Sequence, residues 1–331
     1  MYSASRLTVR PLQPKDESAL HALLARHPYH DYRAFPRMPV DAGHRLLLTY
    51  FAQGNERLAA GGVWVGETIV AAGLLEHLEW DSKHFGLAMG RFGPLVTDPR
   101  DTTPGTMEAL VDWLLERARA AGLEHLAVKV DSAELGVLQA LETRGFRLVD
   151  CLVTYFYDGH RDPLPPMKQL GAIRDYEPSD LDAVLAIAER MLGEYGGRFA
   201  FDPWLPREAV RRFYVEWTRN ACAGHMANRL LVGERHGRVV GFLGYGMQSR
   251  PLQSLGVRIA GHGISAVLPE GTGLYPALLT KAIVVDRFVT YDMAEFDTSV
   301  QNVLPQRIFQ RMGFHLARTK YTLHWSEKGD A

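Results

Sequence analysis

Apolar and polar positions change period in an order that predicts a similar series of elements twice along the chain. In the first half, alternation predicts strands at 6–11, 58–65, 68–78, 91–96 and 125–130, and helical spacing predicts helices at 14–26, 107–121 and 135–143. In the second half we expect strands at 172–176, 230–234, 239–246 and 295–302, with helices at 179–194, 207–222 and 304–312. Each half then closes a helix with a Gly-Phe pair, at 145–146 and 313–314, and starts another strand. The fold class is therefore α/β (α+β).

Three segments need a separate interpretation. Residues 78–86 interrupt the first half, and we expect a turn that Trp80 anchors by packing. Ser179 is expected to cap the helix that follows it, with Asp182 at the capping-box position. Three prolines between residues 157 and 168 predict a linker. We therefore place one domain at 1–160, a linker at 161–170 and a second domain at 171–331.

An apolar run in the second half breaks into Gly271-Thr272-Gly273 and then resumes with helical spacing. Both glycines can adopt positive φ and let a ligand approach the backbone, and Pro276 suits the first turn of a helix. Amides at a helix start, together with the helix dipole, favour a diphosphate. The tripeptide alone is equally typical of an ordinary turn between a strand and a helix. No pair of spaced glycines stands at 99–105 in the first half, so we expect one phosphate loop per chain.

Composition narrows the class of protein. A length of 331 residues predicts about two domains. The formal net charge of −1 gives no electrostatic reason to expect a nucleic acid or membrane partner. Cys151 and Cys222 form no CxxC motif, which fits a reducing cytoplasm and predicts neither a disulfide framework nor a metal site. No signal peptide is apparent, and no apolar run reaches the ~20 residues that span a bilayer. We expect a cytoplasmic protein.

The order of strand, glycine-rich loop, helix, strand and short helix with Gly-Phe resembles the C-terminal half of the GCN5-related N-acetyltransferase (GNAT) family. The resemblance implies two tandem GNAT-like domains, each a mixed, mostly antiparallel sheet flanked by helices. It implies acetyl-coenzyme A as co-substrate, bound by the second domain only, and no metal. In such a site the diphosphate is held at the loop, the pantetheine arm pairs with the strand before it, and Asn302 helps to hold the opened strand pair. The implied cofactor residues are Ala266, Val267, Leu268, Gly271, Thr272, Gly273, Leu274, Tyr275 and Asn302.

Three segments, 78–86, 213–221 and 298–302, resemble the dTDP-fucosamine acetyltransferases and related nucleotide-sugar N-acetyltransferases. This implies a small-molecule amine acceptor, and we favour a dTDP-linked amino sugar. It also implies a general base on the strand after Gly145-Phe146, where Asp150 is the matching residue. The alternative is that Asp150 is a solvated carboxylate at a strand end. We interpret the adjacent Cys151 as a buried apolar residue rather than a nucleophile.

That subfamily places a proton-donating tyrosine four residues before the glycine, where this chain has Phe309. Tyr275, Tyr291 and Tyr321 are substitutes, and we favour Tyr321, whose alternative role is that of a half-buried strand tyrosine. For the nucleotide end of the acceptor we consider an aromatic loop, in which aromatic rings stack a base and Arg binds phosphate. Its members are Arg198, Phe199, Phe201 and Trp204, and they could equally pack on the core.

Two other functions stay open. The acceptor could be an amino acid, a peptide amine or an aminoglycoside, because the fold does not determine the acceptor. A non-catalytic acyl-coenzyme A sensor is suggested by Phe309 and by Glu270, which stands where the loop usually carries a basic residue. We allow for a homodimer.

Overall fold

The computed structural model describes residues 7–52, 57–101, 103–162, 171–192, 197–247, 255–261, 263–286 and 292–329. The chain forms two compact units, of which the first comprises residues 1–34, 38–151 and 319–331 and the second comprises 35–37 and 152–318. The domain limits expected at 160 and 171 remain a prediction. Most of the expected linker, at 163–170, and the candidate Tyr291 lie outside the described residues.

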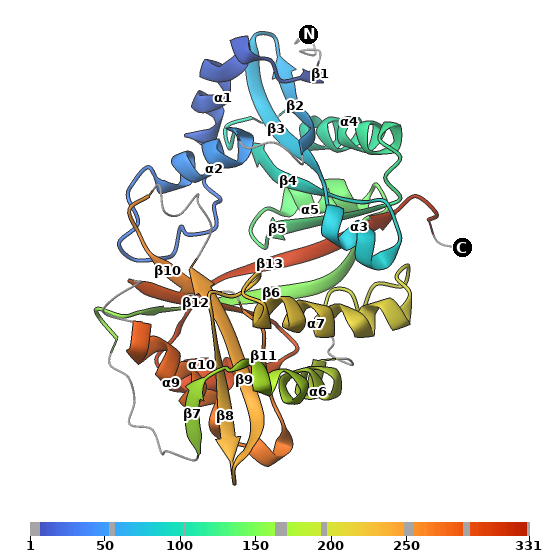
Figure 1. Cartoon of the computed structure of the whole chain (residues 1–331). Helices are drawn as coiled ribbons and strands as arrows, with labels where there is room; N and C mark the ends of the chain where they lie inside the picture. Colours follow the sequence, from blue (N-terminus) through green and yellow to red (C-terminus); the bar gives the residue numbers. More distant parts are fainter. Residues whose placement is uncertain are drawn as a thin grey trace. The chain divides into compact units, whose positions relative to one another are not determined.

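The first unit is built on a sheet with the strand order β1-β2-β3-β4-β5-β13 (Figure 1). Its strands are β1 (Leu7–Pro11), β2 (Arg57–Val65), β3 (Thr68–His77), β4 (Met89–Thr97) and β5 (His125–Asp131), and β5 lies parallel to β4. Its helices are η1 (Pro14–Asp16), α1 (Glu17–Leu24), α2 (Ala42–Ala52), α3 (Glu79–Phe85), α4 (Thr106–Ala120) and α5 (Leu135–Glu142). Helices α1 and α2 pack their apolar side chains on one face of the sheet, and α4 and α5 pack on the other.

Two helices of the first unit differ from the sequence-based expectation. The turn expected at 78–86 is wrong, because Glu79–Phe85 forms α3, which Gly86 ends with a left-handed φ of 68°. Trp80 is not a buried anchor, since it is 37% exposed and stacks on His84. Phe85 is the side chain that α3 buries. Helix α2 had no sequence prediction, and Gly43 within it weakens the helical signal.

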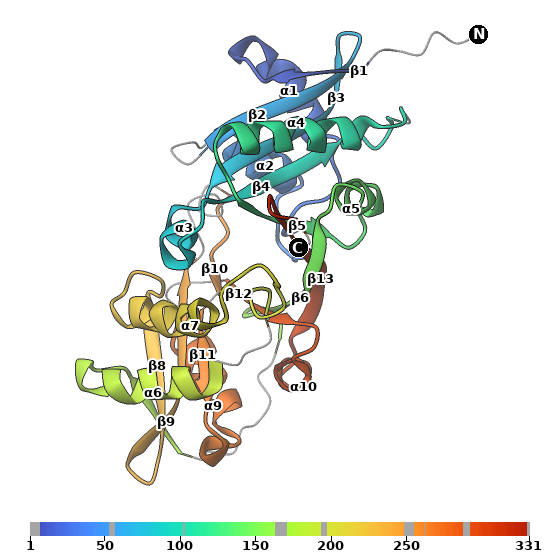
Figure 2. The same ribbon diagram turned by 90° about the vertical axis from the view of Figure 1, so that its right-hand side faces the viewer.

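The second unit has the strand order β6-β12-β10-β9-β8-β7, and β11 pairs with β9 off this path. Its strands are β6 (Arg147–Asp158), β7 (Ala172–Asp175), β8 (Arg229–Arg235), β9 (Arg238–Met247), β10 (Ile259–Gly261), β11 (Ser265–Val267) and β12 (Met293–Ser299). Its helices are η2 (Pro178–Asp180), α6 (Leu181–Leu192), α7 (Arg207–Cys222), η3 (Pro269–Gly271), α9 (Leu274–Asp286) and α10 (Val303–Arg311). Helices α9 and α10 cover one face of its sheet, and α6 covers the other with α7 packed beside it (Figure 2).

The start of α6 is capped differently from the expectation. Pro178 occupies the first position of η2, which places the capping box at Glu177 and Asp180 rather than at Ser179 and Asp182. The backbone N–H of Glu177 donates to Asp180 Oδ2 at 2.9 Å. Arg174 on β7 binds the same carboxylate at 2.7 Å and ties the helix start to the edge of the sheet.

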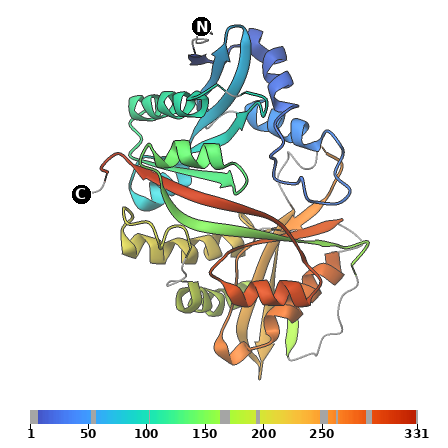
Figure 3. The same ribbon diagram turned by 180° about the vertical axis from the view of Figure 1, so that it is seen from behind.

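The last strand, β13 (His315–Ser326), pairs along residues 320–326 with β5 of the first unit. Conversely, residues 152–158 of β6 pair with β12 of the second unit. Figure 3 shows β6 and β13 as two long neighbouring strands. Trp325 is 6% exposed and lies beside Phe146 in the apolar core of the first unit. Each unit therefore completes its sheet with a strand from the other half of the sequence.

Candidate active site

Two strands of the second unit diverge where the sequence resemblance implied an opened strand pair. Strand β10 pairs in parallel with the beginning of β12, and the last partners are Gly261 and Glu295. Strand β11 then leaves β12 and pairs with β9. Within the described residues, the part of β12 after Glu295 pairs with β6 on one edge and with no strand on the other. The opened edge is therefore present in the second unit.

The backbone of β11 alternates between β9 and this open edge. The N–H of Leu268 donates to Val240 O, and the N–H of Gly244 donates to Ile264 O, each at 2.8 Å. Antiparallel alternation then directs the backbone groups of Ala266 toward β9 and those of Ser265 and Val267 toward the open edge. Of the three residues expected to pair with a pantetheine arm, Val267 is the one so placed. Ser265 was missed, although the alternation of a strand would have indicated it.

The two glycines of the loop serve different purposes. Gly273 has a φ of 90° directly before α9, so the positive φ predicted there is confirmed. The positive φ predicted for Gly271 is wrong. A Cβ at Gly271 would lie 2.8 Å from Val267 Cγ1 and 3.2 Å from the carbonyl oxygen of Val240. Gly271 is therefore required by the close packing of η3 against β9 and β11.

Two amides of the loop are used inside the turn itself. The N–H of Gly271 donates to Leu268 O at 2.8 Å, and the N–H of Thr272 donates to Pro269 O at 3.1 Å. The first-turn amides of an α-helix have no acceptor within the helix. The N-terminal end of α9, which begins at Leu274 after Gly273, is therefore the part of the loop suited to an anion.

Basic side chains reach this loop from other elements. Arg235, at the end of β8, donates to the carbonyl oxygens of Glu270 at 2.7 Å and Thr272 at 3.3 Å. Arg190 on α6 pairs with the Glu270 carboxylate at 3.1 Å. The backbone amide of Glu270 itself, and then Arg190, lower the pKa of this carboxyl. Two arginines that are distant in sequence therefore contact this loop, in which position 270 itself is a glutamate.

The turn after β12 is fixed by a side chain that sequence reasoning missed. Asn302 is the N-cap residue of α10, and its N–H donates to Ser299 O at 2.9 Å. Gln306 donates through Nε2 to the carbonyl oxygens of Val300 at 2.8 Å and Asn302 at 3.1 Å. Both residues hold the end of β12 next to the opened edge.

Phe309, where the sequence resemblance implied a tyrosine, is buried, with 1% exposure. Its ring lies 5.4 Å from the ring centroid of Tyr155 and 6.2 Å from that of Tyr275. Tyr321, by contrast, packs against the apolar core of the first unit. The structure therefore brings Tyr275 and Tyr155 to the side of Phe309.

Asp150 is 5% exposed, so the alternative of a solvated carboxylate is wrong. Its Oδ1 accepts the N–H of Cys151 at 2.8 Å. Burial, and then the Asp150 charge, raise the pKa of the Cys151 thiol. A raised pKa disfavours the thiolate, which agrees with Cys151 not being a nucleophile.

The aromatic loop of the second unit is divided between packing and surface. Phe199 is 2% exposed and packs on Phe213 with ring centroids 4.5 Å apart, while the Arg198 guanidinium covers its ring at 4.3 Å. Phe201 is 44% exposed, and Trp204 is half-buried. Phe199 thus belongs to the core, and the expected contact with a nucleotide base falls to Phe201 and Trp204.

The first unit has a corresponding divergence of β4 and β5, whose pairing ends at Arg91 and Ala127. His27 lies at the end of β4, with Nδ1 3.3 Å from the backbone N of Thr97 and Nε2 3.6 Å from Glu134 Oε1. Burial is the main cause that lowers the pKa of His27 to about 4 and raises that of Glu134 to about 8. The side chains of His27 and Glu134 therefore fill the place where β4 and β5 have separated.

The loop before α4 also differs from the loop of the second unit. Asp98 accepts the N–H of Arg100 at 3.0 Å, and Asp101 accepts the N–H of Thr103 at 3.1 Å and the hydroxyl of Thr106 at 2.8 Å. Carboxylates take the donors that a phosphate would need, and their charge repels a diphosphate.

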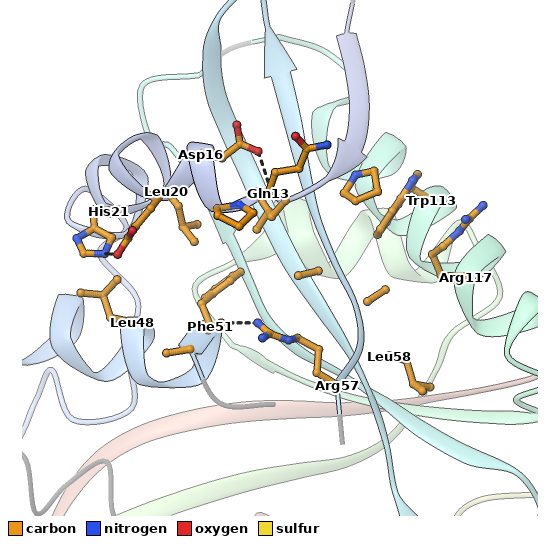
Figure 4. A pocket seen from close by; sticks show the side chains of 17 residues that line it. Gln13, Asp16, Leu20, His21, Leu48, Phe51, Arg57, Leu58, Trp113 and Arg117 are labelled. Atoms are coloured by element: carbon orange, nitrogen blue, oxygen red, sulfur yellow. Dashed lines mark hydrogen bonds and ion pairs between the residues drawn. The ribbon is translucent and has the colours of Figure 1, made fainter. Parts of the chain in front are cut away.

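A separate cavity of about 640 Å³ lies in the first unit between α1, α2, the start of β2 and α4 (Figure 4). Apolar side chains such as Leu20, Leu48 and Phe51 form much of its lining, and Trp113 and Arg117 line it from α4. Figure 4 shows Arg57 directed toward the Phe51 carbonyl oxygen, to which it donates a hydrogen bond. None of the residues expected to take part in acetyl transfer lines this cavity.

Comparison with known proteins places this geometry in a fold family. No family model matches the chain. The spore coat polysaccharide biosynthesis protein SpsD of Bacillus subtilis is 26% identical over 215 residues, which cover 62% of this chain and 68% of the relative. The dTDP-fucosamine acetyltransferase of Escherichia coli O6:H1 is 26% identical over 200 residues, covering 59% of this chain and 77% of the relative.

Solved structures extend the likeness to nearly the whole chain. A GCN5-related N-acetyltransferase from Sphaerobacter thermophilus superimposes with a TM-score of 0.61 and 17% identity, covering 97% of this chain and 95% of the other. A tandem GNAT protein from the clavulanic acid biosynthesis pathway gives a TM-score of 0.53 and 15% identity, covering 97% and 98%. The chain has the tandem GNAT fold, which confirms the expected fold class. Its fold and its relatives indicate an N-acetyltransferase.

In the described part of the chain, no helix is long and apolar enough to cross a bilayer.

Proposed function

We propose that this protein transfers an acetyl group from acetyl-coenzyme A to the amine of a small acceptor, and that the second unit binds the coenzyme. The observation that carries the proposal is the opened edge of β11 and β12, which leads into Gly273 and the start of α9. Backbone groups of Ser265 and Val267 face that edge and would pair with the pantetheine arm. The N-terminal end of α9, with Arg235 beside the loop that precedes it, would hold the diphosphate.

For the acceptor we propose a dTDP-linked amino sugar. The names of two relatives support this choice, since one is a dTDP-fucosamine acetyltransferase and the other a polysaccharide biosynthesis protein. Arg198, Phe201 and Trp204 would contact the nucleotide, because exposed aromatic rings stack bases and guanidinium groups bind phosphate. An amino acid, peptide amine or aminoglycoside is the alternative acceptor.

Two residues are proposed for proton transfer, Asp150 from the sequence resemblance and Tyr321 as a substitute for the tyrosine that is absent at Phe309. Asp150 is the candidate that the resemblance gives for receiving the acceptor's proton through a water molecule, and Tyr321 is our candidate for donating a proton to the leaving thiolate. We expect Tyr321→Phe to lower kcat more than Tyr275→Phe. The opposite order would move the donor to the first turn of α9, where Tyr275 lies beside Phe309.

A turnover assay with acetyl-coenzyme A and a panel of amino-sugar nucleotides, followed by mass spectrometry, tests the proposal. We expect a gain in mass of one acetyl group on at least one dTDP-amino sugar and a single coenzyme site per chain by calorimetry. Binding of acetyl-coenzyme A without turnover of any amine would replace the enzyme by a sensor. Turnover of another amine class alone would keep the reaction and change the acceptor.

A further inference from the structure

Asp297 on β12 lies just beyond the point where β10 stops pairing. The last pair with β10 is formed by Glu295, two residues earlier. Phe296 points into the aromatic core beneath α9 and α10. Since neighbouring side chains of a strand point to opposite faces, Asp297 lies on the other face of β12. Its side chain is half-buried, whereas Thr298 and Ser299 after it are buried.

A neighbouring strand fixes the carboxylate. Thr154 of β6 stands directly opposite Asp297, and its hydroxyl donates to Asp297 Oδ1. Thr154 is 3% exposed, so this donor is held within the sheet. A carboxylate can accept several hydrogen bonds, and this one fixes the orientation of the group.

The backbone of Asp297 faces the opened edge. The N–H of Gly159 donates to Asp292 O at 3.1 Å. Because hydrogen-bonded and non-hydrogen-bonded pairs alternate along an antiparallel ladder, Ala294 and Phe296 are the next residues of β12 whose backbone groups bond to β6. The N–H and C=O of Asp297 consequently point to the side from which β11 has departed. A thioester lying along this edge between Val267 and Asp297 would bring its carbonyl carbon beside the Asp297 residue.

We propose that Asp297 binds the acceptor's ammonium group and takes its proton, a role that rests on the acetyl transfer proposed above. A protonated amine has no lone pair and cannot attack, so one proton must pass to a base. In the reaction the amine nitrogen bonds to the thioester carbonyl carbon, and the carbon–sulfur bond breaks. The leaving thiolate takes a proton from the donor proposed above, which recovers the second proton of that nitrogen, and the Asp297 proton is released to solvent. The Thr154 hydroxyl is a positioning group for the carboxylate.

The test compares four variants by the pH dependence of kcat/KM and by acetyl-coenzyme A affinity. Asp297→Asn removes the base but keeps the size of the side chain, and Thr154→Val removes the orienting hydroxyl. Asp150→Asn tests the other candidate carboxylate. Asp182→Asn, at an exposed position on α6, is the matched control.

We expect Asp297→Asn to lower kcat/KM by ~10²- to 10⁴-fold at neutral pH, in the range typical of general bases. The deficit should shrink as pH rises toward the pKa of the free amine, because the acceptor then loses its proton without help. Thr154→Val should give a smaller loss with the same coenzyme affinity, and Asp182→Asn should match the native protein. Asp297→Glu should recover part of the rate, which separates lost chemistry from misfolding.

The proposal for Asp297 is overturned if Asp297→Asn keeps the native rate and pH profile. It is equally overturned if only Asp150→Asn abolishes the dependence on pH, or if Asp297→Asn and Asp297→Glu both lose coenzyme binding. An inactive native protein would instead refute the proposed acetyl transfer, and this outcome is seen before any variant is compared.

Discussion

Gly271 lies so close to Val267 that a Cβ would come within 2.8 Å of Val267 Cγ1. Gly271→Val should therefore displace η3 from β9, where the Val240 carbonyl oxygen blocks any simple shift. We expect coenzyme A affinity to fall by about tenfold or more, since tight backbone approach is lost. Calorimetry provides the measurement. Gly136→Ala, which has open space in the first unit, is the control, and unchanged affinity in Gly271→Val would contradict the packing argument.

Gly273 imposes a conformational rather than a steric demand. A valine at its φ of 90° is strained by about 1–3 kcal/mol. Gly273→Val should lower both the melting temperature and coenzyme A affinity. Gly273→Asn should be milder, because Asn tolerates positive φ better. Equal effects of Val and Asn would show that backbone conformation is not the reason for this glycine.

Arg235 is expected to contribute to diphosphate binding in two ways. It fixes the carbonyl oxygens of Glu270 and Thr272 and places a positive charge near the start of α9. Arg235→Ala should weaken coenzyme A binding several-fold at low salt and by less at high salt, because ions screen the charge. Titrations at two ionic strengths measure this. Arg212→Ala, exposed on α7, should leave both affinities unchanged.

The buried pair of His27 and Glu134 predicts how stability depends on pH. The pKa of Glu134 is raised to about 8, so the folded chain holds this proton more tightly than the unfolded chain. Its contribution to stability is full below its ordinary pKa near 4.5 and is lost as pH rises toward 8. The pKa of His27 is lowered to about 4, so its effect on the pH dependence of stability has the opposite sign. Its contribution to stability is present above about pH 6.5 and is lost as the pH falls.

Of these two residues, only Glu134 therefore changes the stability of the protein with pH above pH 6.5. Glu134→Gln should flatten the decline in the urea midpoint between pH 6.5 and 8. Glu116→Gln, on the exposed side of α4, should keep the native slope. If both variants decline like the native protein, Glu134 does not titrate in this range.

The order of elements was predictable because period and turn chemistry are local properties. The positive φ of Gly273 could be predicted because this glycine stands directly before a helix. The main helices and strands could be predicted from the spacing of apolar residues. Helix α3 was missed because its polar residues, around Trp80, show no apolar stripe. Glu177 was missed as a cap because the proline after it shifts the helix start.

The candidate site was harder to predict because it depends on partners distant in sequence. The break between β10 and β11 decides which backbone groups face the opened edge, and no periodicity reveals it. Thr154 and Asp297 meet through strand pairing across more than a hundred residues of sequence. Arg235 likewise reaches the loop from β8, which is distant from it in sequence. Local pattern therefore predicted the loop, and tertiary pairing determined its surroundings.

The pairing of β5 with β13 has a consequence for how the protein is made. Residues 125–131 leave the ribosome long before residues 320–326 are synthesised. During that interval β5 carries an unpaired edge, and such edges invite association with other chains. The sheet of the first unit is therefore completed only after β13 has been translated, so the first half of the polypeptide cannot finish folding as soon as it leaves the ribosome.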